Sequence, residues 1–364
     1  MMVLKRQITS HLNKKSKTRQ RRGTNRTTMQ DVAKQAQVSA STVSLYLRDP
    51  KGVSPSKASQ IKAAIDKLNY VPNLLAGGLA ATKTRVIAVI VPSLTNAFFA
   101  QTVSAMQRYL DQKGYQLLIG DSDYDEDKEY ELAKTFLAWS PLGLVMTGAK
   151  HSDACERLLK STQTKIVQTW ELTASPDFFQ VGFSHYNVGR LAASHLFSLG
   201  KKKVAYVAAN LSFDRRATER GQGFCETWDR LAKEPPTIID IEGQVSPVSG
   251  VKALSELLSQ AQAFDAVFCS NDIIAMGLML EATRRDINIP NTLSVISFGD
   301  LPFAEILSPG LTTIRPPSEL IGQHAIDAIL DSDTQNPRLL QGLSKEGKNA
   351  QVDLAFELVI RGSS

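Results

Sequence analysis

Hydrophobic residues recur at helical spacing in three short stretches between residues 28 and 68. The apolar positions of the three stretches are Val32, Ala33 and Ala36; Val43 and Leu47; and Ile61, Ile65 and Leu68. Residues three or four positions apart share one face of a helix, so each stretch predicts a short amphipathic helix. The outward face of the second stretch, residues 40–47, carries Ser41, Thr42 and Ser44.

Residues that favour helix starts precede each stretch. Thr28 is followed three positions on by Asp31, Ser39 precedes the second stretch, and Ser54 is followed by Pro55. Hydroxyl side chains accept hydrogen bonds from the first free amides of a helix, and proline is well suited to the first helical position. These signals predict three short helices joined by tight turns.

From residue 85 onward the pattern changes to short apolar runs that alternate with helical stretches. The runs are 86–91, 116–119, 142–146, 165–168, 204–207, 266–269 and 293–298. Continuous apolar runs of this length are typical of parallel strands buried on both faces, and we expect a helix after each. About 280 residues of this kind predict a doubly wound α/β domain of two similar lobes with a ligand cleft between them.

Positive charge is concentrated at the N-terminus. Residues 1–30 contain no acidic residue and nine basic ones: Lys5, Arg6, Lys14, Lys15, Lys17, Arg19, Arg21, Arg22 and Arg26. The whole chain carries +6, so the part after residue 30 carries −3. This asymmetry indicates a polyanionic partner at the N-terminus. For residues 1–26, two interpretations remain: an arm that contacts DNA, or a solvated, disordered tail with no role.

Several function classes lack support. Cys155, Cys225 and Cys269 are far apart and predict reduced thiols, as in a cytoplasmic protein. No apolar run approaches the length of a signal peptide or a membrane span, so we expect neither export nor a membrane partner. We find no phosphate loop, dinucleotide fingerprint or metal-ligand spacing, and Ser122, Asp123 and His185 are too scattered to nominate as catalytic. The sequence thus predicts no enzyme, cofactor or metal.

The literal sequence of the helical region carries a resemblance. The string DVAKQAQVSASTVS at residues 31–44, with VS at 53–54 and LNYVPN at 68–73, resembles the helix-turn-helix headpiece of the lac/gal repressor family. The resemblance implies an all-α headpiece over residues 27–71 that binds double-stranded operator DNA. On patterning alone, a small helical subdomain without DNA binding remains the alternative.

The resemblance assigns DNA contacts residue by residue. The expected DNA-binding residues are Thr28, Ser39, Ala40, Ser41, Thr42, Ser44, Arg48, Asn73 and Leu79. Ala40 and Ser41 match the positions at which family members choose their operator. Both are small and offer no bidentate base readout, so Ser and Thr hydroxyls, methyl contacts to thymine, or Arg48 must supply more of the readout. Thr28, Ser39, Thr42, Ser44 and Asn73 match phosphate contacts, which set the register on DNA.

Residues 72–84 match the family's hinge. In that family the hinge becomes helical on DNA, and the leucine that matches Leu79 inserts into the minor groove. Gly77 and Gly78 each disfavour a helix, so we expect the free hinge to be disordered and its induced helix to be weak. A plain flexible linker is the alternative.

Residues 85–364 resemble the family's ligand-sensing core, a periplasmic-binding-protein-like domain of two doubly wound lobes. The matching strings are PSLTNAFF at 92–99, FSHYNVGR at 183–190, RGQGF at 220–224, SNDIIAMG at 270–277 and LTTI at 311–314. The implied effector-binding residues are Ser93, Phe98, Phe99, Trp170, Arg220, Phe268, Asn271 and Gly299. Arg220 matches the cleft arginine that grips a ligand's hydroxyls or carboxylate, with a surface ion pair as the alternative. For Phe98, Phe99 and Phe268, burial in the core is the alternative.

One departure bears on the ligand. Many sugar-responsive members have an aspartate after the strand that ends at Phe298, whereas this chain has Gly299 and then Asp300. Loss of a carboxylate there lowers repulsion toward an anionic ligand. With SFGD at 297–300 and VGFS at 181–184, the chain resembles the gluconate-utilisation repressor branch, which implies a sugar acid as effector. Arg215 and Arg216, expected in a loop before Arg220, either add positive charge to the cleft or are solvated.

The final segment, 351–361, resembles the family's last strand, and no leucine heptads follow it. We therefore expect a homodimer that reads a pseudo-palindromic operator. The resemblance to catabolic branches of the family, and not the sequence itself, implies that the ligand releases the protein from DNA by shifting the population of two lobe arrangements. Two other classes remain: a sugar-binding protein, and an α/β enzyme with a helical appendage that does not bind DNA. Either would be favoured if residues 28–80 proved dispensable for activity.

Overall fold

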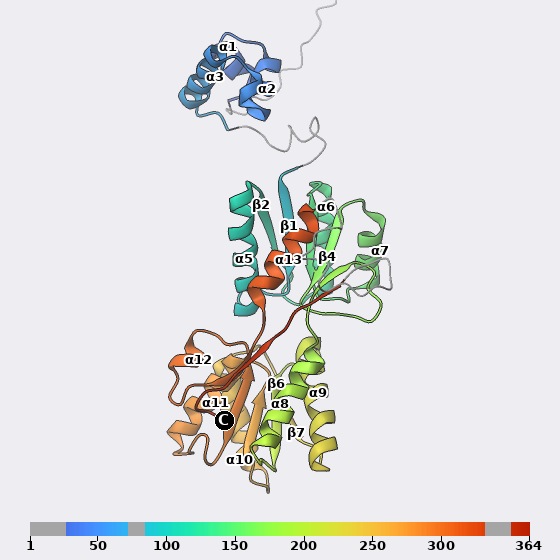
Figure 1. The fold of residues 1–364 in the computed structure, drawn as a ribbon, viewed down its shortest axis with the longest axis vertical. Coiled ribbons are helices and arrows are strands. Elements are labelled where there is room, and N and C mark those ends of the chain that lie inside the picture. Colours follow the sequence, from blue (N-terminus) through green and yellow to red (C-terminus); the bar gives the residue numbers. More distant parts are fainter. Residues whose placement is uncertain (1–26, 72–83, 332–350) are drawn as a thin grey trace, which may run out of the picture. The chain divides into compact units, whose positions relative to one another are not determined.

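The computed structural model describes residues 27–71, 84–331 and 351–364 (Figure 1). The basic segment 1–26 and the hinge residues Asn73, Gly77, Gly78 and Leu79 lie outside the described residues. The chain divides into two compact units, Met1–Ala80 and Ala81–Ser364. Each unit is described by itself.

The first unit contains three helices around a small apolar core. They are α1 (Met29–Gln35), α2 (Ala40–Arg48) and α3 (Pro55–Leu68), with the 3-10 turn η1 (Pro50–Gly52) before α3. Val32, Val43 and Ile61 are fully buried at its centre, and Leu47 packs against them. The amphipathic pattern of the sequence is therefore confirmed.

The helix starts follow the expected signals, with one difference. The Thr28 hydroxyl and the Asp31 carboxylate form a reciprocal capping box on α1, and the Ser39 hydroxyl accepts a hydrogen bond from the amide of Thr42 on α2. Ser54 occupies the N-cap position of α3 and Pro55 the first helical position, but the Ser54 side chain makes no capping hydrogen bond. Proline has no N–H, so this start has one amide fewer to satisfy.

The first lobe of the second unit is a six-stranded sheet between two helical layers (Figure 1). The sheet order is β11-β5-β4-β3-β1-β2. The strands are β1 (Val86–Val91), β2 (Gln116–Asp121), β3 (Gly143–Thr147), β4 (Lys165–Thr169), β5 (Phe179–Gly182) and β11 (Gln351–Asp353). Alternate residues of a strand face opposite sides. Ile87 and Val89 accordingly pack under α5 (Ala97–Lys113) and α13 (Ser318–Leu330), and Ala88 and Ile90 under α6 (Glu126–Ala138) and α7 (Asp153–Ser161).

The second lobe repeats this plan with the sheet order β12-β10-β9-β8-β6-β7. Its strands are β6 (Val204–Ala209), β7 (Thr237–Ile241), β8 (Ala266–Cys269), β9 (Ser294–Phe298), β10 (Thr312–Arg315) and β12 (Glu357–Val359). One face packs on α8 (His185–Ser198) and α9 (Arg215–Ala232), the other on α10 (Pro247–Ser259) and α11 (Asp272–Arg284). The short helix α12 (Phe303–Ile306) follows β9. Both sheets have buried parallel central strands, as expected for a doubly wound fold.

Three details of the sequence prediction were wrong. Strands β5, β7 and β10 were missed. Each is only four or five residues long and pairs with a longer neighbouring strand. No helix follows β4, which leads through a loop into β5. The expected final strand 351–361 is two strands in different sheets: β11 pairs in the first lobe, and β12 pairs antiparallel to β10 in the second.

The chain passes between the lobes three times. The connections run from β5 to α8, from β10 to α13, and from β11 to β12. Because α13 packs beside α5, the second crossing returns the chain to the first lobe (Figure 1). The carboxyl ends of β4, β5 and β9 lie near these crossings, where the side chains considered next come together.

Candidate functional site

Three hydroxyl groups cluster at the start of α2 in the first unit. The Ser39 Oγ lies 2.7 Å from Ser41 Oγ and 2.8 Å from Thr42 Oγ1, and it accepts from the Thr42 amide at 3.1 Å. All three residues are expected DNA contacts. A helix N-terminus with free amides and hydroxyl donors favours a phosphate, so this cluster suits the backbone of DNA.

The exposed face of α2 includes a residue that the sequence analysis left out. Ser41, Leu45 and Arg48 are exposed and follow one another at spacings of four and three residues. Ala40, expected to choose bases, is half-buried against the headpiece core, and Ser44 is half-buried. Leu45 therefore joins Ser41 and Arg48 on the accessible face, and exposure of a large apolar side chain on a polar helix was the signal.

Thr28 and Arg48 both have contacts within their own helices. The Thr28 hydroxyl donates to Asp31 Oδ2 at 2.7 Å, and Arg48 Nε lies 3.4 Å from the carbonyl oxygen of Ser44. Both side chains are exposed, so each remains accessible to a phosphate or base.

In the second unit, four of the eight expected effector residues lie just after the carboxyl ends of strands. Ser93 follows β1, Trp170 follows β4, Asn271 follows β8 and Gly299 follows β9. Parallel α/β sheets bind ligands at this edge. The structure therefore brings these four residues to the edges at which the two lobes meet.

An aromatic cluster joins the lobes at this position. Its members are Phe98 and Phe99 of α5, Trp170, Phe183 and Phe298. The ring centroids of Phe98 and Trp170 lie 6.4 Å apart, and those of Phe98 and Phe298 lie 5.5 Å apart. Aromatic pairs at such distances add to the stability of apolar contact. Phe98 and Phe99 thus belong to the cluster that packs the lobes against each other, and an effector contact for either stays a prediction.

Arg220 is buried rather than at the surface, which rules out the surface ion pair as its role. Its Nη1 donates to His185 Nδ1 at 2.9 Å and its Nη2 to the carbonyl oxygen of Ser270 at 3.0 Å. The guanidinium carbon lies 4.4 Å from the centre of the Phe298 ring. Arg220 Nε is buried without a hydrogen-bond partner. A buried donor without a partner is costly, so this atom is available to a ligand acceptor.

His185 links Arg220 to the first lobe. Its Nε2 lies 3.1 Å from the Trp170 carbonyl oxygen. The imidazole is therefore the tautomer in which Nε2–H donates to Trp170 and Nδ1 accepts from Arg220. Burial, together with the charges of Arg220 and Arg216, holds the pKa of His185 well below its usual range, so the ring is neutral. The Trp170 backbone has φ of 74°, an unusual value for a bulky residue that the surrounding packing maintains.

Glu171 forms an ion-pair cluster across the lobes that the sequence did not predict. Its carboxylate pairs with Arg215 and, at 2.9 Å, with Arg216, and it accepts from the Ala149 amide at 3.2 Å. Arg215 and Arg216 stand in the first turn of α9, not in a loop, and the Arg216 side chain is only 12% exposed. Neither is simply solvated: both bind a buried carboxylate of the first lobe.

Close contacts leave no room for a side chain at Gly299. Its φ is +143°, and a Cβ there would lie 2.4 Å from Phe98 Cε1 and 3.1 Å from Asp272 Oδ2. The Asp272 carboxylate accepts from the Leu301 amide and the Thr313 hydroxyl, both at 2.7 Å, and from Ser297. Asp272 thus holds the backbone turn after β9 in position.

Asp300 turns away from the lobe junction. Its carboxylate pairs with Arg315 at 2.6 Å and with Arg361 at 2.7 Å. Both partners belong to the second lobe, so this carboxylate ties β10 to the C-terminal segment. The negative charge that follows Gly299 in the sequence is therefore neutralised within the lobe.

The remaining expected effector residues differ in their surroundings. Ser93 Oγ lies 2.8 Å from Thr95 Oγ1, and Asn271 caps α11 by accepting from the Ile274 amide at 3.1 Å. Phe268 is fully buried, with its ring centroid 5.3 Å from those of Tyr206 and Phe224. Phe268 packs in the second-lobe core, and an effector contact for it stays a prediction.

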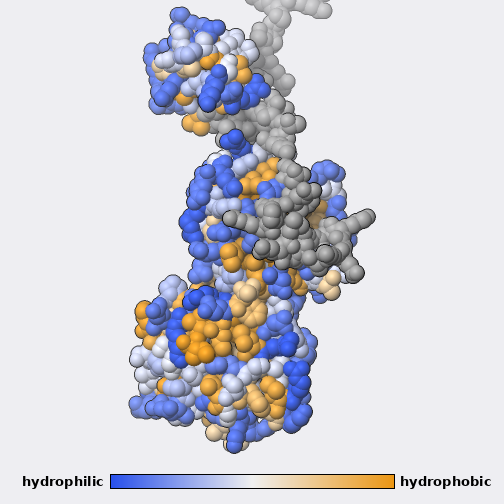
Figure 2. All heavy atoms as spheres, in the orientation of Figure 1, coloured by the Kyte–Doolittle hydropathy of each residue, from blue (hydrophilic) through white to orange (hydrophobic). Residues whose placement is uncertain are grey.

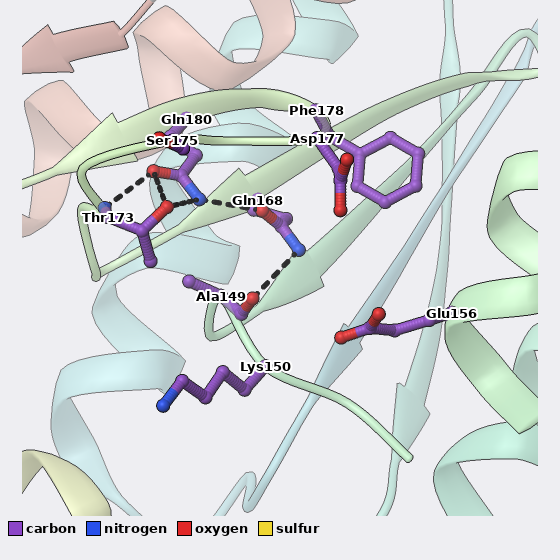
Figure 3. Close-up of a pocket in the computed structure, with 9 residues that line it drawn as sticks. All are labelled: Ala149, Lys150, Glu156, Gln168, Thr173, Ser175, Asp177, Phe178 and Gln180. Carbon is purple, nitrogen blue, oxygen red and sulfur yellow. Dashed lines mark hydrogen bonds between the residues drawn. The ribbon is translucent and has the colours of Figure 1, made fainter. Parts of the chain in front are cut away.

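A separate pocket of about 220 Å³ lies in the first lobe (Figure 3). Its lining consists of Ala149, Lys150, Glu156, Gln168, Thr173, Ser175, Asp177, Phe178 and Gln180. Gln180 Nε2 donates to Gln168 Oε1 at 2.8 Å, and Gln180 Oε1 accepts from the Thr173 amide at 2.9 Å (Figure 3). None of the expected effector residues lines this pocket, so it is distinct from the lobe junction.

Each of the two units matches a known protein family. Residues 28–73 match the family described as bacterial regulatory proteins, lacI family. Residues 84–343 match the periplasmic binding proteins and sugar binding domain of LacI family. The chain is 33% identical to the HTH-type transcriptional regulator GntR of Pseudomonas aeruginosa over 94% of this chain and 97% of that protein.

Solved structures show the same relation. The transcription regulator GntR from Chromobacterium violaceum is 32% identical, with a TM-score of 0.67 over 77% of this chain and 99% of that chain. The lac repressor dimer bound to operator is 26% identical, with a TM-score of 0.77 over 93% of this chain and 99% of that chain. The chain belongs to the LacI family and is a DNA-binding transcriptional regulator.

Proposed function

We propose that the chain is a cytoplasmic, homodimeric repressor of a carbohydrate or sugar-acid catabolic operon, and that a sugar acid such as gluconate or a ketogluconate releases it from its operator. The chain acts by binding and not by catalysis. This proposal extends the family assignment by naming the effector class, the sign of its effect and the assembly.

The arrangement of arginines on α9 carries the effector class. Arg215, Arg216 and Arg220 all reach the lobe junction, and one carboxylate, Glu171, makes the ion pairs with the first two. The unpartnered, buried Nε of Arg220 offers a further donor to an anion. A guanidinium binds a carboxylate through parallel hydrogen bonds, while the aromatic cluster suits the apolar faces of a sugar chain.

Contacts across the lobes support a coupling between effector and operator binding. A ligand that binds one lobe arrangement more tightly shifts the population toward it, with a coupling of about 1–3 kcal/mol in typical allosteric systems. The Glu171 ion pairs and the Phe98–Phe298 contact both cross the lobes, so a ligand that competes with them changes the lobe arrangement.

Exposed apolar residues of the second lobe support dimerisation. Ile238 of β7, Val248 and Leu258 of α10, and Leu280 of α11 are each at least half exposed, and these elements are neighbours. Figure 2 shows apolar residues gathered over part of this lobe. Apolar surface of this kind commonly marks a protein interface. No helix among the described residues is both long and apolar enough to span a membrane.

Operator binding tests the proposal. Anisotropy would be measured with DNA from the protein's own promoter region, with and without millimolar gluconate, 2-ketogluconate or glucose. We expect specific binding that only the acids weaken, and an Arg220→Gln variant that binds the operator but no longer responds. Release by glucose alone would contradict the sugar-acid assignment, and absence of specific binding would contradict the repressor function.

A further inference from the structure

Three side chains with metal-ligating atoms meet in the first lobe, away from the lobe junction. Glu129 comes from α6, His151 from the loop between β3 and α7, and Cys155 from the first turn of α7. One ligand atom from each lies within 4.8 Å of the other two. From this geometry we propose that Glu129, His151 and Cys155 form a binding site for a transition-metal dication, with zinc as the preferred ion.

The distances are close to those of a bound ion. With a Zn–S bond of about 2.3 Å and Zn–N and Zn–O bonds of about 2.0–2.1 Å, neighbouring ligand atoms of a tetrahedral site lie roughly 3.3–3.7 Å apart. The present separations are within 4.8 Å, and His151 Nδ1 already lies 2.9 Å from Glu129 Oε2. Small side-chain rotations therefore suffice to close the site around an ion.

His151 presents Nδ1 to the cluster. Its side chain is only 1% exposed, and Nδ1 is the nitrogen that lies 2.9 Å from Glu129 Oε2. Nδ1 would therefore bind the ion beside the Glu129 carboxylate, in place of the hydrogen bond between them. Nε2, on the far side of the ring, has no hydrogen-bond partner and is not part of the site.

The charge around the thiol favours a cation. The carboxylates of Glu129, Glu156 and Glu126 all act electrostatically on the Cys155 sulfur, so a bound cation would offset negative charge there. Thiolate and imidazole together select zinc over the hard ions magnesium and calcium. On binding, the Cys155 thiol releases its proton to solvent, and the fourth position is left for water.

The pocket of Figure 3 adjoins the site along the chain. Lys150 precedes His151, Glu156 follows Cys155, and both line the pocket, whereas none of the three proposed ligands does. Bound metal would clamp α6 to the loop before α7. The same loop holds Ala149, whose amide donates to Glu171 at the lobe junction.

Cobalt substitution tests the site. The untagged full chain, stripped of metal and kept reduced with a phosphine, would be titrated with Co²⁺ and then with Zn²⁺. We expect one equivalent of Co²⁺ per chain, a thiolate-to-cobalt charge-transfer band with strong tetrahedral visible bands, and loss of both on adding one equivalent of Zn²⁺. A Co²⁺ spectrum without the thiolate band would overturn the proposal.

Variants identify the ligands. Cys155→Ala should lose the charge-transfer band, and Cys155→Ala, His151→Gln and Glu129→Gln should each weaken Zn²⁺ binding by about 10-fold or more. Cys225→Ala, which removes a thiol of the second lobe, is the matched control and should bind as the wild type does. Because Cys155 is fully buried, circular dichroism without metal checks folding, and Glu129→Gln serves if Cys155→Ala unfolds. Wild-type affinity in folded Cys155→Ala or Glu129→Gln would refute the site.

Discussion

Replacing Glu171 with glutamine separates two roles that its carboxylate could have in effector binding. Glu171 is 4% exposed and binds Arg215 and Arg216, the donors that an effector carboxylate would use. If Glu171 competes with the effector, its loss frees both arginines. If it instead accepts from effector hydroxyls, its loss weakens binding. Glu171→Gln retains the size of the side chain and removes only the charge.

The expected magnitude follows from the charges. An effector carboxylate that shares these arginines would lie roughly 6 Å from the Glu171 carboxylate, where like charges repel by about 3 kcal/mol at an effective dielectric constant of about 20. Arg215 is 35% exposed, so solvent screening reduces this. A net gain of about 1–2 kcal/mol corresponds to about 5- to 30-fold tighter binding of the acid.

Isothermal titration of the full chain with gluconate and with a neutral polyol of the same length measures the effect. The measured quantity is the ratio of the affinities for gluconate and for the polyol. If Glu171→Gln only loosened the contact between the lobes, both affinities would change alike and the ratio would stay the same. Glu131→Gln is the matched control, since Glu131 is an exposed first-lobe residue paired with Lys134. Weaker acid binding by Glu171→Gln, or an unchanged acid-to-polyol ratio, would refute competition.

Five further substitutions test the packing and the protonation states. Gly299→Ala should destabilise the core by about 2–4 kcal/mol in urea unfolding, because it combines positive φ with a clash against Phe98. Adding Phe98→Ala should recover part of this loss. If the free-energy changes of the two single variants simply add in the double variant, the contact is contradicted. Thr28→Ala should cost the headpiece about 1 kcal/mol in thermal melting. Hydrogen bonds from Thr28 lower the pKa of Asp31, so headpiece stability that is present at neutral pH should be lost as pH falls through that lowered value. Asp31→Asn should abolish this pH dependence. An equal loss of stability in acid for the wild type and Asp31→Asn, measured by melting, would count against it. His185 has a lowered pKa, so the unfolded chain binds a proton that the folded chain does not, and core stability should fall as pH drops below about 6.5. His185→Gln should flatten that slope, and an unchanged slope would show that another group is responsible.

Local patterns predicted the elements whose structure depends on neighbours in the sequence. The capping box of Thr28 and Asp31, the cap at Ser39 and the buried runs of β1, β3 and β8 all appear where spacing and composition placed them. Strands β5, β7 and β10 were missed, because a strand of four or five residues has too little pattern of its own and forms where a neighbouring strand offers hydrogen bonds.

The candidate site divides in the same way. The resemblance predicted Phe98, Trp170, Arg220 and Gly299 as residues of the cleft between the lobes, and the structure places them at the lobe junction. It did not predict that Arg220 bonds to His185, or that Leu45 is exposed on α2. Both depend on how separate elements turn toward or away from each other, which no single stretch of sequence records.

The sequence by itself determined the helix-turn-helix pattern, the doubly wound class of the core and the family, because hydrophobic periodicity, helix caps and motif strings act over a few neighbouring residues. Only the tertiary structure decided which distant charges meet: Glu171 with Arg216 across the lobes, Asp300 with Arg361, and Glu129 with His151 beside Cys155. The physical reason is that ion pairing and metal ligation depend on distances of a few ångströms between side chains, which exist only once the sheets and helices have packed.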